Sequence, residues 1–101
     1  MTILWTEPAL NDISAIRDYI AQDSETYAAS FAESILARVE RLSEFPRLGR
    51  VVPEANAADI RELVHRGYRI MYQVHQNTVH VLTVLHGHRD VSGMSLKPWE
   101  V

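Results

Sequence analysis

Three segments rich in β-branched and aromatic residues follow one another in the second half of the chain with almost no sequence between them. They are IRELVHR (60–66), YRIMYQVH (68–75) and TVHVLTVLH (78–86), separated only by Gly67 and by Gln76-Asn77. Such side chains favour strands, and so short a connection joins antiparallel neighbours, because a parallel crossover needs about a dozen residues or more. The sequence therefore predicts a three-stranded antiparallel meander, around which the rest of the chain must fold.

The second connection also predicts which side chains share a face of the meander. A two-residue turn at Gln76-Asn77 pairs Gln73 with His80, and alternate residues then lie on the same side of the sheet. One side is expected to face solvent and to hold Gln73 with His80, Met71 with Leu82, and Arg69 with Val84, followed by His86, His88 and Arg89. The other side is expected to face a helical layer and holds Tyr68, Ile70, Tyr72, Val74, Val79, Val81, Thr83 and Leu85.

The first half of the chain predicts one strand and two helices. Residues 2–5 (TILW) are short, extended and apolar, and Thr6 then suits the cap of a helix that tolerates Pro8 in its first turn. Apolar residues recur there at spacings of three and four, and they do so again from the cap Ser24 until Pro46 ends the pattern. The short connection between these two amphipathic helices folds them into an antiparallel hairpin.

These elements predict an α+β fold of the order β-α-α-β-β-β. One apolar seam on the helix hairpin and one apolar face on the meander bury each other, with the hairpin on one face of a small, mainly antiparallel four-stranded sheet. Residues 45–59 carry two prolines and a glycine and are expected to be irregular. With 101 residues, the chain is expected to form one domain, 1–101.

The composition narrows the environment and the partners. The chain has no cysteine, no basic and apolar leader, and no apolar run long enough to cross a bilayer, so we expect a cytoplasmic protein without a membrane partner. Its net charge of −3 argues against general binding to nucleic acids, which depends on many lysines and arginines. Nine of its ten basic residues are arginine, which suits bidentate binding of carboxylate or phosphate.

The polar residues at the end of the last strand have two interpretations. Arg69 and Arg89 beside His88 resemble a phosphodiester site, in which guanidinium groups stabilise negative charge and an imidazole transfers a proton. The alternative is a polar sheet face with ordinary ion pairs, for which Glu62 and Asp90 supply the carboxylates. His86 and His88 are spaced like metal ligands on a strand, but no third ligand is evident, so neither a metal nor another cofactor is expected.

Four words in the sequence carry a resemblance to a known family. They are FPRLGRVVPE (45–54), IREL (60–63), GYRIMYQV (67–74) and VLHGHRD (84–90). In this order and spacing the chain resembles the RelE/ParE toxins of type II toxin–antitoxin modules, also called plasmid stabilisation proteins, over residues 3 to about 90. The resemblance implies the same α+β fold and a small DNA-binding antitoxin as partner.

The resemblance leaves the branch of the family, and so the target, to be decided. The RelE-like branch cuts mRNA on the ribosome, and it would use Arg69, His88 and Arg89 as catalytic residues here. Its lysine positions fall on Ile60 and Glu62, however, and its tyrosine position falls near Ser95.

The ParE-like branch inhibits DNA gyrase by protein binding and has no catalytic residues of its own. The words P-x-x-G-R and LHG-x-R-D favour this branch, and Arg61, Arg69, His88 and Arg89 would then bind the antitoxin or the target. A relative that has lost toxicity and survives as an antitoxin-binding partner or regulator is the third possibility.

Overall fold

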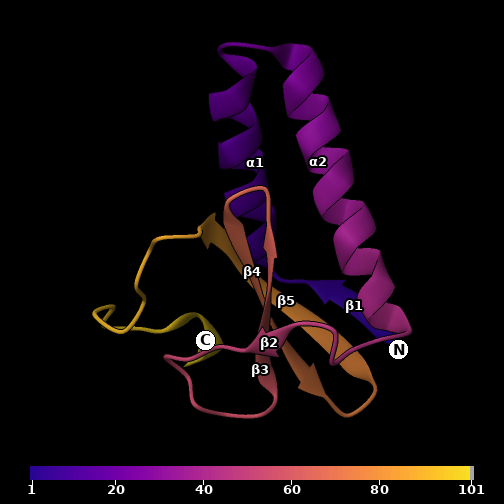
Figure 1. The fold of residues 1–101 in the computed structure, drawn as a ribbon, viewed down its shortest axis with the longest axis vertical. Coiled ribbons are helices and arrows are strands. Elements are labelled where there is room, and N and C mark those ends of the chain that lie inside the picture. The colour runs from indigo at the N-terminus through magenta and orange to yellow at the C-terminus, as the bar shows by residue number, and fades with distance from the viewer. Residues whose placement is uncertain (101) are drawn as a thin grey trace.

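The computed structural model describes residues 1–100 as two helices on one face of a five-stranded sheet (Figure 1). The elements are β1 (Thr2–Trp5), α1 (Glu7–Ala21), α2 (Glu25–Glu40), β2 (Arg50–Val51), β3 (Ile60–His65), β4 (Tyr68–His75) and β5 (Thr78–His86), with 3₁₀ helices at Arg41–Ser43 and Pro98–Glu100. The predicted α+β fold is confirmed. The sheet has a fifth strand because Arg50 and Val51, in the stretch expected to be irregular, pair with β3.

The strand order is β1-β5-β4-β3-β2, so the meander β3-β4-β5 forms the centre of the sheet. β1 lies parallel to β5, and the other pairs are antiparallel. Arg66 and Gly67 both have positive φ, 50° and 83°, as a two-residue type I′ hairpin turn requires. In the second turn it is Gln76 that has positive φ, at 53°.

Both predicted helix caps are confirmed. The Thr6 side chain accepts a hydrogen bond from the backbone N–H of Ala9 at 3.3 Å, and Ser24 accepts one from Tyr27 at 3.0 Å. The two helices run side by side and project beyond the end of the sheet (Figure 1). Among residues 1–100, no helix is long and apolar enough to cross a membrane.

The pairing of β4 with β5 differs from the prediction because it contains a β-bulge. Gln73 pairs with His80 as expected, but the register shifts between Met71 and Tyr72, so that Arg69 lies opposite Leu85. The predicted pairs Met71 with Leu82 and Arg69 with Val84 are wrong, because one extra residue in a strand exchanges its faces. The predicted sharing of a face by Arg69 and His86 is wrong for the same reason, since His86 lies opposite Tyr68.

The sheet has a buried cluster on each face. The helix-side cluster contains the sheet residues Leu63, Ile70, Tyr72, Val79, Val81 and Val84, with Ala9, Phe31, Ile35, Val39 and Leu42. The outer cluster, on the face away from the helices, contains Val52, Ile60, Met71, Leu85 and Val91. The outer face was expected to be solvated, but the connection around Val52 and the tail beginning at Val91 cover part of it.

Candidate functional site

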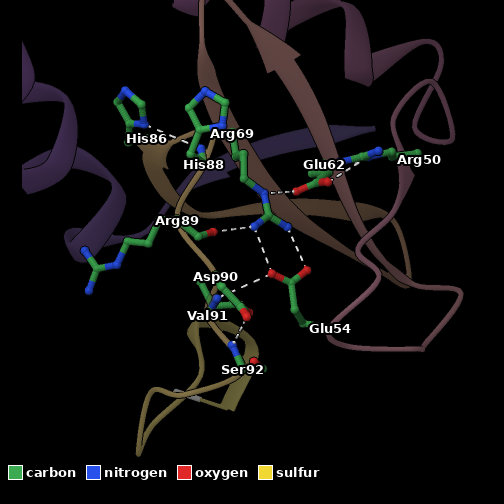
Figure 2. Close-up of polar contacts among 10 residues, drawn as sticks. All are labelled: Arg50, Glu54, Glu62, Arg69, His86, His88, Arg89, Asp90, Val91 and Ser92. Carbon is green, nitrogen blue, oxygen red and sulfur yellow. Dashed lines mark hydrogen bonds and ion pairs between the residues drawn. The ribbon is translucent and has the colours of Figure 1, made fainter.

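Arg69 lies at the centre of a buried polar network on the outer face (Figure 2). Its Nε donates to Glu62 at 2.6 Å, and its two Nη atoms donate to the two carboxylate oxygens of Glu54 at 2.9 and 2.8 Å. Nη1 also donates to the carbonyl oxygen of Arg89 at 2.7 Å. The Arg69 side chain is only 6% exposed, so its guanidinium is occupied within the protein.

The partners of Arg69 connect parts of the chain that are far apart in sequence. Glu62 comes from β3, where its fully buried carboxylate also accepts a hydrogen bond from Nε of Arg50 at 2.7 Å. Glu54 comes from the connection before β3 and also accepts from the backbone N–H of Val91 at 3.4 Å. The Arg69 network thus joins the connection, two strands and the start of the tail.

The electrostatics of the network fix its charge states. The hydrogen bond from Arg69 lowers the pKa of Glu54 from 4.5 to about 2, although burial opposes this shift. Conversely, the hydrogen bond to Glu54 raises the pKa of Arg69 above its ordinary value, again against burial, with Glu62 contributing in the same direction. Arg69 therefore stays charged and paired, and it has no free donor edge to offer a phosphate.

A second set of contacts fastens the P-x-x-G-R loop to the sheet. The Tyr72 hydroxyl donates to the carbonyl of Pro46 at 2.7 Å and accepts from the N–H of Gly49 at 2.9 Å. Burial raises the pKa of this hydroxyl. Arg61 donates to the carbonyl oxygens of Gly49 at 2.9 Å and Ala58 at 3.0 Å, so it too serves the local backbone.

The remaining predicted site residues, His88 and Arg89, form an exposed rim together with His86 where β5 ends. His86, His88 and Arg89 are exposed, and the Arg89 side chain points away from the carboxylates of the network (Figure 2). The ring centroids of His86 and His88 are 5.4 Å apart, and the backbone N–H of His88 donates to Nδ1 of His86 at 3.4 Å. Within residues 1–100, no third histidine, cysteine or carboxylate completes a metal-binding group.

The structure separates the two interpretations of these polar residues. Of the two carboxylates expected to pair with arginine, Glu62 does so, whereas Asp90 instead accepts from the backbone N–H of Ser92 at 2.9 Å. Arg69 reaches the Arg89 backbone carbonyl, but its guanidinium is buried, whereas the side chains of His86, His88 and Arg89 are exposed at the rim. The cluster that looked compact in the sequence is therefore divided between a buried network and an exposed rim.

A groove of about 580 Å³ runs beside the rim, between α1, the second half of β5 and the tail. It exists because β1 ends at Trp5, opposite Val81, and leaves the remainder of β5 without a strand on that side. Asp12 of α1 takes over part of that edge by accepting hydrogen bonds from the Thr83 hydroxyl and from the N–H of Val84 at 3.1 Å. The groove walls are largely apolar and include Ile16, Leu82, Met94 and Leu96, with His86 and Arg89 at the edge.

Two contributors to these sites were missed from the sequence. Glu54 lies in the word VVPE, but nothing in the local pattern indicates that it reaches Arg69, fifteen residues away. Asp12 reads as an ordinary polar position of an amphipathic helix. Asp12 can bond β5 only because β1 ends before that point, and strand ends are poorly determined by sequence.

Comparison with known proteins identifies the family. Residues 3–91 match the family described as ParE toxin of type II toxin-antitoxin system, parDE. The chain is 38% identical over 88 residues to Toxin RelE2 of Caulobacter vibrioides, covering 86% of this chain and 96% of the relative. It also superposes on a chain from the chromosomal ParDE toxin–antitoxin system of P. aeruginosa, with a TM-score of 0.71, 21% identity, and coverage of 85% of this chain and 95% of that one. The chain belongs to the ParE toxin family of type II toxin–antitoxin systems.

Proposed function

We propose that this toxin acts by binding DNA gyrase and has no nuclease site of its own. The observation that carries the proposal is the state of Arg69, whose side chain is 6% exposed and whose guanidinium is held by two carboxylates. By the family resemblance, Arg69 is the arginine that a RelE-like nuclease would aim at RNA, and Glu62 stands where that branch has a phosphate-binding lysine. A buried carboxylate at this position repels a phosphodiester and retains the arginine for itself.

The alternative is a ribosome-dependent mRNA endoribonuclease of the RelE-like kind. The name of the relative Toxin RelE2 favours it, as does the exposed rim with His88 and Arg89. On this hypothesis His88 would act as acid or base and Arg89 would bind phosphate, both without help from Arg69. Both targets are in the cytoplasm, where we propose that the protein works.

The family implies a cognate antitoxin, and we propose that part of it occupies the groove between α1, β5 and the tail. The apolar walls at Ile16, Met94 and Leu96 suit the apolar side of an antitoxin segment, and Arg89 at the edge suits a carboxylate. The Arg69 network would support this surface from behind by holding the tail, since it bonds the backbone at Arg89 and Val91.

Induced expression with two parallel readouts tests the proposal. We expect growth arrest with a DNA-damage response and, with purified components, loss of gyrase supercoiling or accumulation of cleaved DNA–gyrase complexes. The mRNA should remain uncut in the ribosomal A site. Arg89→Ala and His88→Ala variants serve as the comparison, because they remove the exposed candidates for nuclease chemistry.

Each alternative gives a different result. Ribosomal A-site cuts that disappear in the His88→Ala or Arg89→Ala variant would establish the nuclease and refute the gyrase proposal. Normal growth on induction, with normal supercoiling by purified gyrase, would identify a non-toxic relative retained for antitoxin binding or regulation.

A further inference from the structure

A cluster of cations lies on a part of the surface that neither the groove nor the Arg69 network uses. The cation cluster consists of Arg38 on α2 with His65 and Arg66 at the turn between β3 and β4. A 3.0 Å contact between His65 Nε2 and the Ser34 hydroxyl joins the turn to α2. At the start of the same helix, the Arg66 guanidinium carbon lies 6.0 Å from the centroid of the Tyr27 ring.

The charges of this cluster have no internal partner. Among residues 1–100, Arg17, Arg50 and Arg69 form ion pairs with carboxylates, but neither Arg38 nor Arg66 has a carboxylate oxygen within 4.0 Å. Of the exposed carboxylates of α2, Glu25 pairs with Arg17, and the spacing of Glu33 and Glu40 from Arg38 places them on another side of the helix. Other arginines, such as Arg89, also lack an ion pair within residues 1–100, but Arg38 and Arg66 both lie close enough to His65 to lower its pKa.

The histidine itself responds to these cations. The pKa of His65 is lowered first by burial and then by the positive charges of Arg38 and Arg66, with no carboxylate acting in the opposite direction. The Ser34 hydroxyl donates to the carbonyl of Phe31 at 2.7 Å, so it can only accept from Nε2 of His65. Nδ1 is therefore the nitrogen that gains a proton when an anion offsets the two arginines.

The backbone at Arg66 provides an independent indication. Its φ is 50°, in the left-handed region that costs an ordinary side chain about 1 kcal/mol or more. This first position of a type I′ turn favours asparagine, aspartate or glycine, any of which would relieve the strain. An arginine here is conformationally unfavourable, yet the turn places its guanidinium over Tyr27 and on the same side as Arg38.

We propose that Arg38, His65 and Arg66 form a docking surface for a short acidic peptide segment of a protein partner. The two guanidinium groups bind carboxylates of that segment, His65 donates a further hydrogen bond, and the half-exposed Tyr27 packs against its side chains. This surface lies apart from the groove proposed for the antitoxin, and the inference does not depend on whether gyrase or the ribosome is the target.

A long polyanion fits the surrounding charges less well than a short segment. Helix α1 carries Glu7, Asp12 and Asp18 against a single basic residue, Arg17, and Asp23 and Glu25 follow at the tip of the hairpin. A nucleic acid lying across the cluster would place its further phosphates near these carboxylates, where like charges repel. A short peptide with a few glutamates contacts the cation cluster without extending to these carboxylates.

The test measures anisotropy of a fluorescein-labelled hexaglutamate peptide at low ionic strength, with a labelled oligothymidylate of twelve nucleotides as the nucleic-acid probe. Arg66→Asn removes the guanidinium and suits the turn, and Arg38→Gln preserves a helix-forming side chain. Each variant should weaken peptide binding about fivefold, and the double variant about twentyfold or more, because each loses one charge-assisted contact. Arg47→Gln, at an exposed turn before β2, is the matched control and should bind like the parent.

His65 supplies a second readout that does not depend on the variants. In NMR titrations the pKa of the His65 imidazole should rise when hexaglutamate is bound, because the peptide carboxylates favour the charged ring. The proposal is refuted if hexaglutamate does not bind, if Arg47→Gln weakens its binding as much as the cluster variants do, or if the oligothymidylate binds more tightly than the peptide. An unchanged His65 pKa with bound peptide would also place the contact elsewhere.

Discussion

Replacing Arg69 with methionine should destabilise the protein severely. The substitution keeps an unbranched side chain of similar length but removes four hydrogen bonds, those to Glu62, to both oxygens of Glu54 and to the Arg89 carbonyl. It leaves the Glu62 side chain, which is 0% exposed, with Arg50 as its one cation. Removing one partner of a buried ion pair typically costs about 3–5 kcal/mol.

The pKa of Glu54 gives a second value of similar size for the free energy of unfolding that Arg69→Met should remove. Its pKa is lowered from 4.5 to about 2. That difference corresponds to roughly 3 kcal/mol of stability at neutral pH. Domains of this size unfold with a total of about 5–15 kcal/mol, so the loss should remove a large part of the stability. The melting temperature should fall by about 12 °C or more.

Urea unfolding followed by tryptophan fluorescence measures this effect. Trp5 packs against the helix-side cluster and Trp99 against the outer cluster, so the two report on both faces of the sheet. Arg89→Met is the control, because its exposed guanidinium makes no ion pair within residues 1–100 and its loss should change stability by about 0.5 kcal/mol or less. A cost below about 1 kcal/mol for Arg69→Met would refute the structural role of the network.

Three further predictions concern the same region. Because the folded pKa of Glu54 lies below its ordinary value, the contribution of Glu54 to stability is complete above about pH 5 and is lost as the pH falls towards 2. The Arg69→Met variant lacks this contribution, so its acid unfolding, followed by circular dichroism, should start at higher pH. Gly49→Ala should cost about 1–3 kcal/mol in urea unfolding, since its Cβ would clash with the backbone carbonyl of Glu62 and lie 2.8 Å from the Tyr72 hydroxyl, whereas Gly93→Ala, with open space around it, should be nearly neutral. Tyr72→Phe should cost about 1–3 kcal/mol in thermal melts by leaving the Gly49 N–H without its partner, and an unchanged melting temperature would show that water replaces the hydroxyl.

The parts of the fold that follow local rules were predictable. The spacing of apolar residues, the caps Thr6 and Ser24 and the short connections gave the helix hairpin and the meander, because each depends on residues close in sequence. The register near the second turn was also correct, as the pair Gln73–His80 shows. These are the features for which neighbouring residues carry most of the information.

The errors came from events that local patterns do not record. The bulge at the register shift between Met71 and Tyr72 reversed the faces of Val84 and Leu85, although both are apolar and give no signal of it. The cover of the outer face by Val91 depends on a tail without periodic sequence. The candidate site was mispredicted in consequence, since residue types that suit a phosphate site also suit a buried ion-pair network, and only burial distinguishes them.

The Arg69 network has a consequence for how sequences of this kind diverge. Three of the four words that carry the family resemblance each supply a charged side chain to it: Glu54, Glu62 and Arg69, while the fourth supplies the Arg89 carbonyl. Their side chains are mutually dependent, so substitution at one should be accompanied by substitution at the others in related chains. We expect Glu54 and Arg69 to covary across homologues whatever those homologues bind, because these sequence words then mark a shared scaffold. Differences in target should instead appear in the exposed rim, the groove and the cation cluster.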